Sequence, residues 1–196
     1  MSVILASASP RRQKLLKLLF GDFKIIPPDI KERLDRSLAP WDLAMSLAAQ
    51  KANAVKNSMS SEILSSDIVI GADTIVASHE KILGKPENEQ EAAEMLRFLS
   101  GDTHRVYTGI CILTQGEEER FFAETKVWFY ELSKREIDRY IATGEPVDKA
   151  GAYAIQGHGA KFIKKIDGDF YNVVGLPVSA VYNKIKELQE QRQMFK

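Results

Sequence analysis

Two adjacent arginines, Arg11 and Arg12, stand where the sequence predicts the start of its first helix. The stretch "ILASASPRRQKLLKLLFG" predicts a strand over residues 3–6, a Ser-rich turn with Ser9 as N-cap, and a helix that begins at Pro10. Cations at a helix N-terminus oppose the helix dipole and therefore cost stability. The pair is either a solvated basic turn or part of an anion site, where guanidinium and backbone N–H groups bind a phosphate together. We favour the phosphate site, because it gives the two charges a partner.

A carboxylate, Asp73, interrupts the apolar run "SDIVIGADTIVAS". The run predicts a buried strand that is broken at residues 71–74, so that Asp73 lies at a strand end or in a bend. Such an aspartate either accepts hydrogen bonds in a turn, or it takes a proton from water or binds Mg²⁺ in phosphate chemistry. A charge buried there is costly without a partner or a metal. The residues alone leave both interpretations open.

For other charged and amide side chains the sequence indicates a functional role less strongly. Lys51 lies on the second predicted helix and Lys85 in the turn "LGKP", where a lone lysine is usually solvated. Asp29 and Glu32 follow a proline pair and are either metal ligands or ordinary loop charges. The stretch "DKAGAYAIQGHGAKFI" places Gln156 among glycines, and its amide can donate to and accept from a base edge. The glycines either allow close approach to a ligand or form strand bends.

The composition excludes several classes of protein. The chain has 196 residues, 44% hydrophobic and 28% charged, which suits one globular domain over residues 1–196. Its 27 basic and 27 acidic residues give no net charge, which argues against a nucleic-acid partner. No apolar run approaches membrane-spanning length and the N-terminus lacks a secretory pattern, so we expect a cytoplasmic protein without a membrane partner.

The cysteine and the histidines indicate no metal or disulfide chemistry. The single cysteine, Cys111, lies in the apolar run "TGICILT", which predicts a buried, unreactive thiol. His79, His104 and His158 are far apart in the sequence, so no zinc site is expected. His79 and His104 lie in turn-like surroundings and are predicted to be solvated.

The elements that must position these residues alternate between strands and helices. The first helix is predicted to run up to Gly21, which lies just past its end, and others are predicted over residues 39–57, 88–101, 133–144 and 178–189. Capping boxes are expected from Asn88 with Glu91 and from Ser133 with Glu136. Strands are predicted over residues 23–26, 105–115 and 120–132, the last two joined as a hairpin, with short strands in the Gly-rich segment 149–177. This order favours a mixed α/β sheet covered by helices.

Five stretches carry a resemblance to a known family. "SASPRRQKLL", "GADTIV", "GKP", "GEPVDKAGAYAIQGHGA" and "NVVGLP" occur in the order and spacing of the Maf family of nucleoside-triphosphate pyrophosphatases, which the chain resembles from about Ile4 to Pro177. The resemblance implies an elongated mixed sheet flanked by helices with a substrate cleft, related to inosine triphosphatases. It also implies hydrolysis of the α–β phosphate bond of a nucleoside triphosphate with a divalent metal, Mg²⁺ or Mn²⁺, and it is compatible with a homodimer.

The resemblance assigns roles to individual residues. Asp73 matches the presumed general base, and Arg11, Thr74 and Gln156 match positions that separate the family's substrate branches. In the branch that acts on 7-methyl-GTP, tryptophan typically replaces the first arginine. Because the arginine pair is intact and occurs with Thr74 and Gln156, the sequence resembles the branch that acts on dTTP and UTP. Which of Arg11 and Gln156 contacts the base stays open, as does the ranking of dTTP, UTP and modified pyrimidine nucleotides.

Further positions match by resemblance as well. Glu32 matches an acidic residue near the metal, which Asp73 would also bind. Gln50 and Lys31 depart from the family, which often has acidic residues there. Four residues match positions where the family contacts phosphates: Ser7, Arg12, Lys51 and Lys85.

Two alternative functions are kept. The first is a nucleotide-binding regulator of septum formation that needs no turnover, which the history of the family suggests. The second is an enzyme that acts on a modified purine triphosphate. Asp73 favours an enzyme, because a pure binder has little use for a carboxylate beside a polyphosphate.

Overall fold

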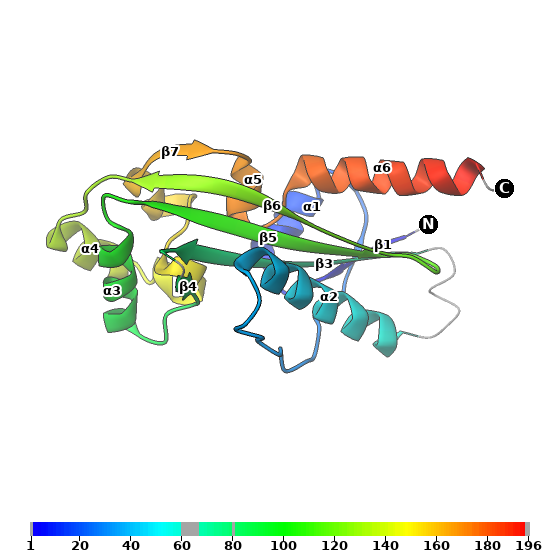
Figure 1. Ribbon diagram of the computed structural model, residues 1–196, viewed down its shortest axis with the longest axis horizontal. Coiled ribbons are helices and arrows are strands. Elements are labelled where there is room, and N and C mark those ends of the chain that lie inside the picture. Colours follow the sequence, from blue (N-terminus) through cyan, green and yellow to red (C-terminus); the bar gives the residue numbers. More distant parts are fainter. Residues whose placement is uncertain (1, 60–66, 80, 195–196) are drawn as a thin grey trace.

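Seven strands form one mixed sheet in the computed structural model, which describes residues 2–59, 67–79 and 81–194. The order is β2-β1-β3-β5-β6-β7, with β4 paired to β3. β1 (Val3–Ala6) is parallel to both β2 (Lys24–Ile25) and β3 (Ile68–Ser78). The other pairs are antiparallel and involve β4 (Lys81–Leu83), β5 (Thr103–Leu113), β6 (Glu118–Phe129) and β7 (Ile163–Asp167). The expected mixed α/β sheet is confirmed, and the long β3, β5 and β6 give it an elongated shape (Figure 1).

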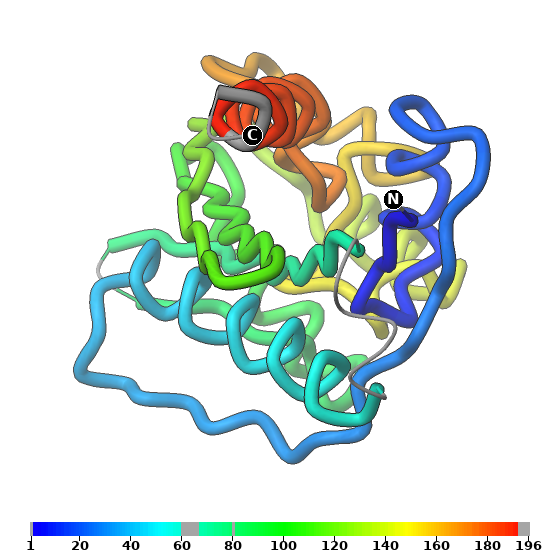
Figure 2. The backbone as a smooth tube through the Cα atoms, turned by 90° about the vertical axis from the view of Figure 1, so that its right-hand side faces the viewer, coloured from blue at the N-terminus to red at the C-terminus, as the bar shows by residue number. Residues whose placement is uncertain are grey.

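Helices cover both faces of this sheet (Figures 1 and 2). On one face, α1 (Pro10–Leu16) and α6 (Val178–Met194) pack over apolar side chains of β1, β3 and β5, next to the short α5 (Phe170–Val174). On the opposite face, α2 (Pro40–Ser58) covers the alternate side chains of the same strands. α3 (Glu89–Leu99) and α4 (Lys134–Ile141) pack at the other end of the long strands. The sheet thus runs through both halves of the molecule.

The close contact between α2 and the sheet depends on two glycines. A Cβ atom added at Gly71 of β3 would overlap the carbonyl oxygen of Ala48, and one added at Gly109 of β5 would overlap the backbone of Ala44 and Met45. Because glycine has no Cβ, the helix axis lies close to the strands. This close approach carries Lys51, one turn after Ala48, to the middle of β3.

Several local predictions are confirmed. β5 and β6 form the expected hairpin, and Ser133 and Glu136 form the expected capping box at the start of α4. Cys111 is fully buried, and burial raises the pKa of its thiol to about 12, in agreement with an unreactive cysteine. At α3 the Asn88 side chain accepts from the Glu91 N–H at 2.9 Å, but the Glu91 carboxylate accepts from the N–H of Glu87, so the box is incomplete.

Other local predictions are wrong. β3 is a continuous strand of 11 residues without the break expected at residues 71–74. α1 ends at Leu16 and a turn follows, so it stops well before Gly21. Within residues 149–177 the expected short strands reduce to β7, and the rest of the segment contains the 3₁₀ helices η2 (Ala150–Ala152) and η3 (Gly157–Phe162) and the helix α5. A further 3₁₀ helix, η1 (Glu145–Asp148), precedes the segment.

His104 also differs from its prediction. It is 1% exposed rather than solvated, and its Nε2 lies 2.7 Å from the hydroxyl of Tyr153. Its ring packs edge-on against Phe129, with the ring centres 4.9 Å apart. The side chain of His104 is therefore surrounded by aromatic rings and not by the water that its turn-like sequence suggested. The side chain of His79, in contrast, is largely exposed, as expected.

Candidate active site

A cleft of about 410 Å³ lies beside β3, a volume usual for small-molecule sites. The turn after β1, the start of α1, the middle of β3, the loop after β4 and the chain from Asp148 to Ala154 contribute to its walls. Gln156 is not one of the described residues that line the cleft. The other eight sequence-predicted site residues do line it: Ser7, Arg11, Arg12, Glu32, Lys51, Asp73, Thr74 and Lys85.

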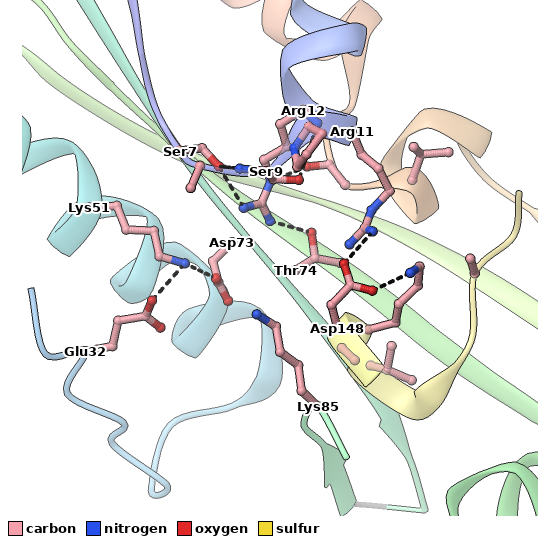
Figure 3. A pocket seen from close by; sticks show the side chains of 18 of the residues that line it. Ser7, Ser9, Arg11, Arg12, Glu32, Lys51, Asp73, Thr74, Lys85 and Asp148 are labelled. Atoms are coloured by element: carbon pink, nitrogen blue, oxygen red, sulfur yellow. Dashed lines mark hydrogen bonds and ion pairs between the residues drawn. The ribbon is translucent and has the colours of Figure 1, made fainter. Parts of the chain in front are cut away.

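Asp73 lies in the middle of β3, and its carboxylate contacts the ammonium group of Lys51 from α2 (Figure 3). The same ammonium group lies 3.2 Å from Oε1 of Glu32, in the loop before α2. The side chains of Lys51 and Asp73 are only 10% and 15% exposed. An opposite charge at contact distance offsets the cost of burying a carboxylate, so Asp73 can stand within a strand without the predicted bend.

Arg12 is fixed by hydrogen bonds from all three guanidinium nitrogens. Nε donates to the carbonyl oxygen of Gly175 at 2.9 Å, Nη2 to the hydroxyl of Thr74 at 3.0 Å, and Nη1 to Ser7 Oγ at 3.5 Å. Burial lowers the pKa of Arg12, while the nearby charge of Asp73 opposes this shift. An arginine remains protonated under such a shift. The result is a fixed positive charge beside Asp73 at the start of α1.

A buried hydrogen-bond network links the Arg12 guanidinium to the interior of the sheet. Thr108 Oγ1 donates to the carbonyl oxygen of Asn172 at 2.9 Å, which uses its one proton. Thr74 Oγ1, 3.0 Å from Thr108 Oγ1, must therefore donate to it and accept from Arg12. The amide of Asn172, fully buried, donates to the carbonyl oxygen of Val106 at 3.0 Å and to Thr125 Oγ1 at 2.9 Å. This network connects Thr74, which the sequence predicted as a specificity position, to buried groups of β5 and β6.

Arg11 points to the other side of the cleft (Figure 3). Its Nη1 lies 3.1 Å from Oδ2 of Asp148, at the end of η1. The other oxygen of Asp148 contacts the ammonium group of Lys149, which also donates to the carbonyl oxygen of Glu145 at 2.8 Å. The two arginines therefore have different partners: Arg12 bonds to β3 and to the residues just after β1 and α5, whereas Arg11 bonds to η1.

Lys85 and Gln156 complete the predicted set. Lys85 is exposed in the loop after β4, and its ammonium group extends toward Asp73 (Figure 3). Gln156 is exposed at the start of η3. The loop that holds it is anchored by Glu145, which accepts from the N–H of His158 at 3.0 Å and of Gly159 at 3.1 Å. The structure thus orders the Gln156 loop but brings only Lys85 into the cleft.

Comparison with known proteins shows the family of this chain. The model of the family described as Maf-like protein matches residues 2–188. The chain belongs to the Maf family. A relative from Bacillus cereus (strain AH187), named dTTP/UTP pyrophosphatase, is 50% identical over 185 residues, which are 94% of each chain. A relative of the same name from Bacillus thuringiensis subsp. konkukian (strain 97-27) is also 50% identical over 94% of each chain.

The structure of the Staphylococcus aureus Ham1 protein matches 66% of this chain and 72% of its own, with 13% identity and a TM-score of 0.43. Among the helices in the described parts of the chain, none is both long and apolar enough to cross a membrane.

The Maf motifs of the sequence all contribute to the site: the first supplies the turn and Arg12, the second Asp73 and Thr74, and the last the Gly175 carbonyl.

Several residues of the site were not singled out from the sequence, among them Asp148, Asn172 and Tyr153. Asp148 and Tyr153 line the cleft, and Asn172 lies beneath it. All three fall inside motifs that carry the family resemblance. The signal was therefore present, but a motif does not tell which of its side chains face the ligand.

The arrangement suits a polyanion. Among the described residues, five cationic side chains and three carboxylates line the cleft: Arg11, Arg12, Lys51, Lys85 and Lys149, with Glu32, Asp73 and Asp148. Arginine binds phosphate oxygens with pairs of charge-assisted hydrogen bonds, and lysine adds point charge. The Asp73 carboxylate lies among these cations, where it can act on a water next to a bound phosphate.

Proposed function

We propose that the protein is a nucleoside triphosphate pyrophosphatase that hydrolyses dTTP and UTP to the monophosphate and pyrophosphate. The observation that carries the proposal is Asp73 in mid-strand, held by Lys51 beside the fixed guanidinium of Arg12. The names of the relatives, dTTP/UTP pyrophosphatase, support the same substrates. The intact pair of Arg11 and Arg12 supports the pyrimidine branch.

In this proposal Asp73 acts as the general base. It accepts a proton from a water that attacks the α-phosphorus; the new P–O bond forms as the bond to the bridging oxygen breaks, and pyrophosphate leaves. Arg12, Lys51 and Lys85 bind the phosphate oxygens on which negative charge accumulates. In the free protein Lys51 neutralises Asp73, and phosphate oxygens offer this ammonium group a new partner when substrate binds. Asp73 then becomes available to the water.

The carboxylates of Glu32 and Asp73 fit a divalent metal ion that substrate phosphates also bind. Glu32 and Asp73 supply carboxylate oxygens on either side of the Lys51 ammonium group, which marks the space between them as one suited to a cation. Among the described residues, no group of three or more His, Cys, Asp or Glu could hold a metal. Mg²⁺ or Mn²⁺ commonly binds one or two carboxylates together with substrate phosphates. When bound, the metal would neutralise part of the triphosphate charge.

The test is pyrophosphate release from a panel of nucleoside triphosphates with Mg²⁺ or Mn²⁺, comparing the wild type with Asp73→Asn. We expect turnover of dTTP and UTP, and a loss of about 10²–10⁴-fold in kcat in the variant. Asp138→Asn, an exposed aspartate on α4 paired with Lys134, is the matched control and should retain full activity.

Three outcomes would contradict the proposal in different ways. Turnover of purine triphosphates alone would retain the mechanism and reject the assigned substrates. Equal rates for the wild type and Asp73→Asn would reject Asp73 as the base. Nucleotide binding by calorimetry without any turnover would instead favour the regulator of septum formation.

A further inference from the structure

One ion pair joins two walls of the cleft. Arg11 leaves the start of α1 and donates from Nη1 to Oδ2 of Asp148 at 3.1 Å, although the residues are 137 positions apart in the chain (Figure 3). Both side chains are in contact with solvent, Arg11 at 33% and Asp148 at 63% exposure. This bond uses one of the five guanidinium N–H donors, so the others can bind a substrate. The ion pair therefore orients Arg11 without blocking it.

Asp148 is itself held in place. Lys149, 14% exposed, contacts the Asp148 carboxylate and donates to the carbonyl oxygen of Glu145 at 2.8 Å. Glu145, at the other end of η1, accepts from the hydroxyl of Tyr140 at 2.8 Å and from the Gln156 loop. A Cβ at Gly157, where φ is +70°, would strike the Glu145 carboxylate. Because both ends of η1 are fixed, Asp148 is a rigid anchor.

Arg11 depends on this anchor more than Arg12 depends on any single partner. Arg12 has three hydrogen bonds that hold its guanidinium in the cleft. For Arg11, the bond to Asp148 plays this part. A long arginine side chain loses considerable rotamer freedom when it is fixed, and a partner that fixes it before the substrate binds removes this cost from binding.

We propose that Asp148 is a positioning residue that holds Arg11 in the orientation required to select pyrimidine nucleoside triphosphates. The inference rests on the proposed function, because it assigns Arg11 a part in substrate selection. Partial burial raises the pKa of Asp148, but Lys149 and Arg11 together outweigh it, so the pKa lies below its ordinary value and the carboxylate is charged at neutral pH. Asp148 acts through Arg11 and takes no part in the bond-breaking step.

A double-mutant cycle tests the coupling. We would measure kcat/KM for dTTP with the wild type, Asp148→Asn, Arg11→Gln and the double variant. The Asp148→Asn change should lower kcat/KM about 10-fold in the wild type and less than about twofold in the Arg11→Gln background. GTP, tested as a substrate or as a competitive inhibitor, should respond less than about twofold to Asp148→Asn. The Asp148→Glu variant should recover most of the activity.

Controls separate this role from a structural one. Asp138→Asn removes another carboxylate that is more than half exposed, from a lysine ion pair outside the cleft, and should leave the kinetics with both nucleotides unaffected. Equal effects of Asp148→Asn in both backgrounds, or parallel changes for dTTP and GTP, would overturn the inference while the proposed function stands. A wild type that releases no pyrophosphate from dTTP or UTP would overturn both.

Discussion

The carbonyl oxygen of Ala48 lies so close to Gly71 that a Cβ atom at residue 71 would overlap it. The contact joins the middle of α2 to the middle of β3, two residues before Asp73. Lys51 follows Ala48 by three residues and therefore lies on the same side of the helix, above the strand. The absence of a side chain at residue 71 thus determines whether the ammonium group can reach the carboxylate.

Substitution of Gly71 by alanine should disturb both stability and the site. The added methyl group must push α2 away from β3, and overpacking of this kind costs roughly 1–3 kcal/mol. Since Lys51 moves with the helix, kcat should fall by more than the loss of folded protein explains. Chemical denaturation and pyrophosphate release measure the two effects. Gly21→Ala is the control, since the described structure has no atom within 4 Å of a Cβ there; equal behaviour of the two variants would contradict the argument.

Replacement of Arg12 by lysine should lower kcat/KM although the charge is retained. Lysine has one nitrogen, whereas Arg12 uses three to reach Gly175, Thr74 and Ser7. Hydrogen bonds to charged groups contribute about 1.5–3 kcal/mol each, so the loss of one from the transition state corresponds to about 10- to 150-fold. Steady-state kinetics with dTTP checks this. Arg105→Lys, at an exposed ion pair with Glu124, should be neutral. Wild-type kinetics for Arg12→Lys would show that charge alone suffices.

Stability should depend on pH through His104. Burial lowers the pKa of His104 to about 4 from the ordinary 6.5, so between these values the unfolded chain binds the proton and the folded chain does not. The contribution of neutral His104 is therefore complete above about pH 6.5 and is lost as the pH falls toward 4, on the order of 3 kcal/mol in total. Unfolding free energies of the wild type and His104→Gln, measured across this range, isolate the effect. Parallel curves for the two proteins would contradict it.

Cys111 should not react with thiol reagents in the folded protein. Its side chain is fully buried on β5, and burial raises the pKa of the thiol to about 12, so little thiolate exists at about pH 8. Mass spectrometry after treatment with iodoacetamide should show no label on the native chain and one label after denaturation. A Lys134→Cys variant adds an exposed thiol that should react at once. Rapid labelling of native wild type would mean that the strand opens.

Features that depend on neighbouring residues were predictable from the sequence. The capping box of Ser133 and Glu136 involves atoms three residues apart, and the β5–β6 hairpin follows from two apolar runs around a short polar turn. The burial of Cys111 follows from its own apolar run. The cationic turn at Arg12 was also visible, because a strand, a Ser-rich turn and a helix start are adjacent in the chain. The alternating order of predicted strands and helices correctly indicated a mixed α/β sheet.

Features that depend on distant partners were decided by tertiary structure. The sequence predicted a break at Asp73, because nothing near it in the chain compensates its charge; Lys51, from a helix 22 residues earlier, does so. His104 was expected in water but is buried against Tyr153, 49 residues away. Asp148 pairs with Arg11, 137 residues away, only because the fold brings η1 next to the start of α1. Burial and charge pairing are properties of the folded surroundings, so a residue's local sequence determines its chemistry but not its partner.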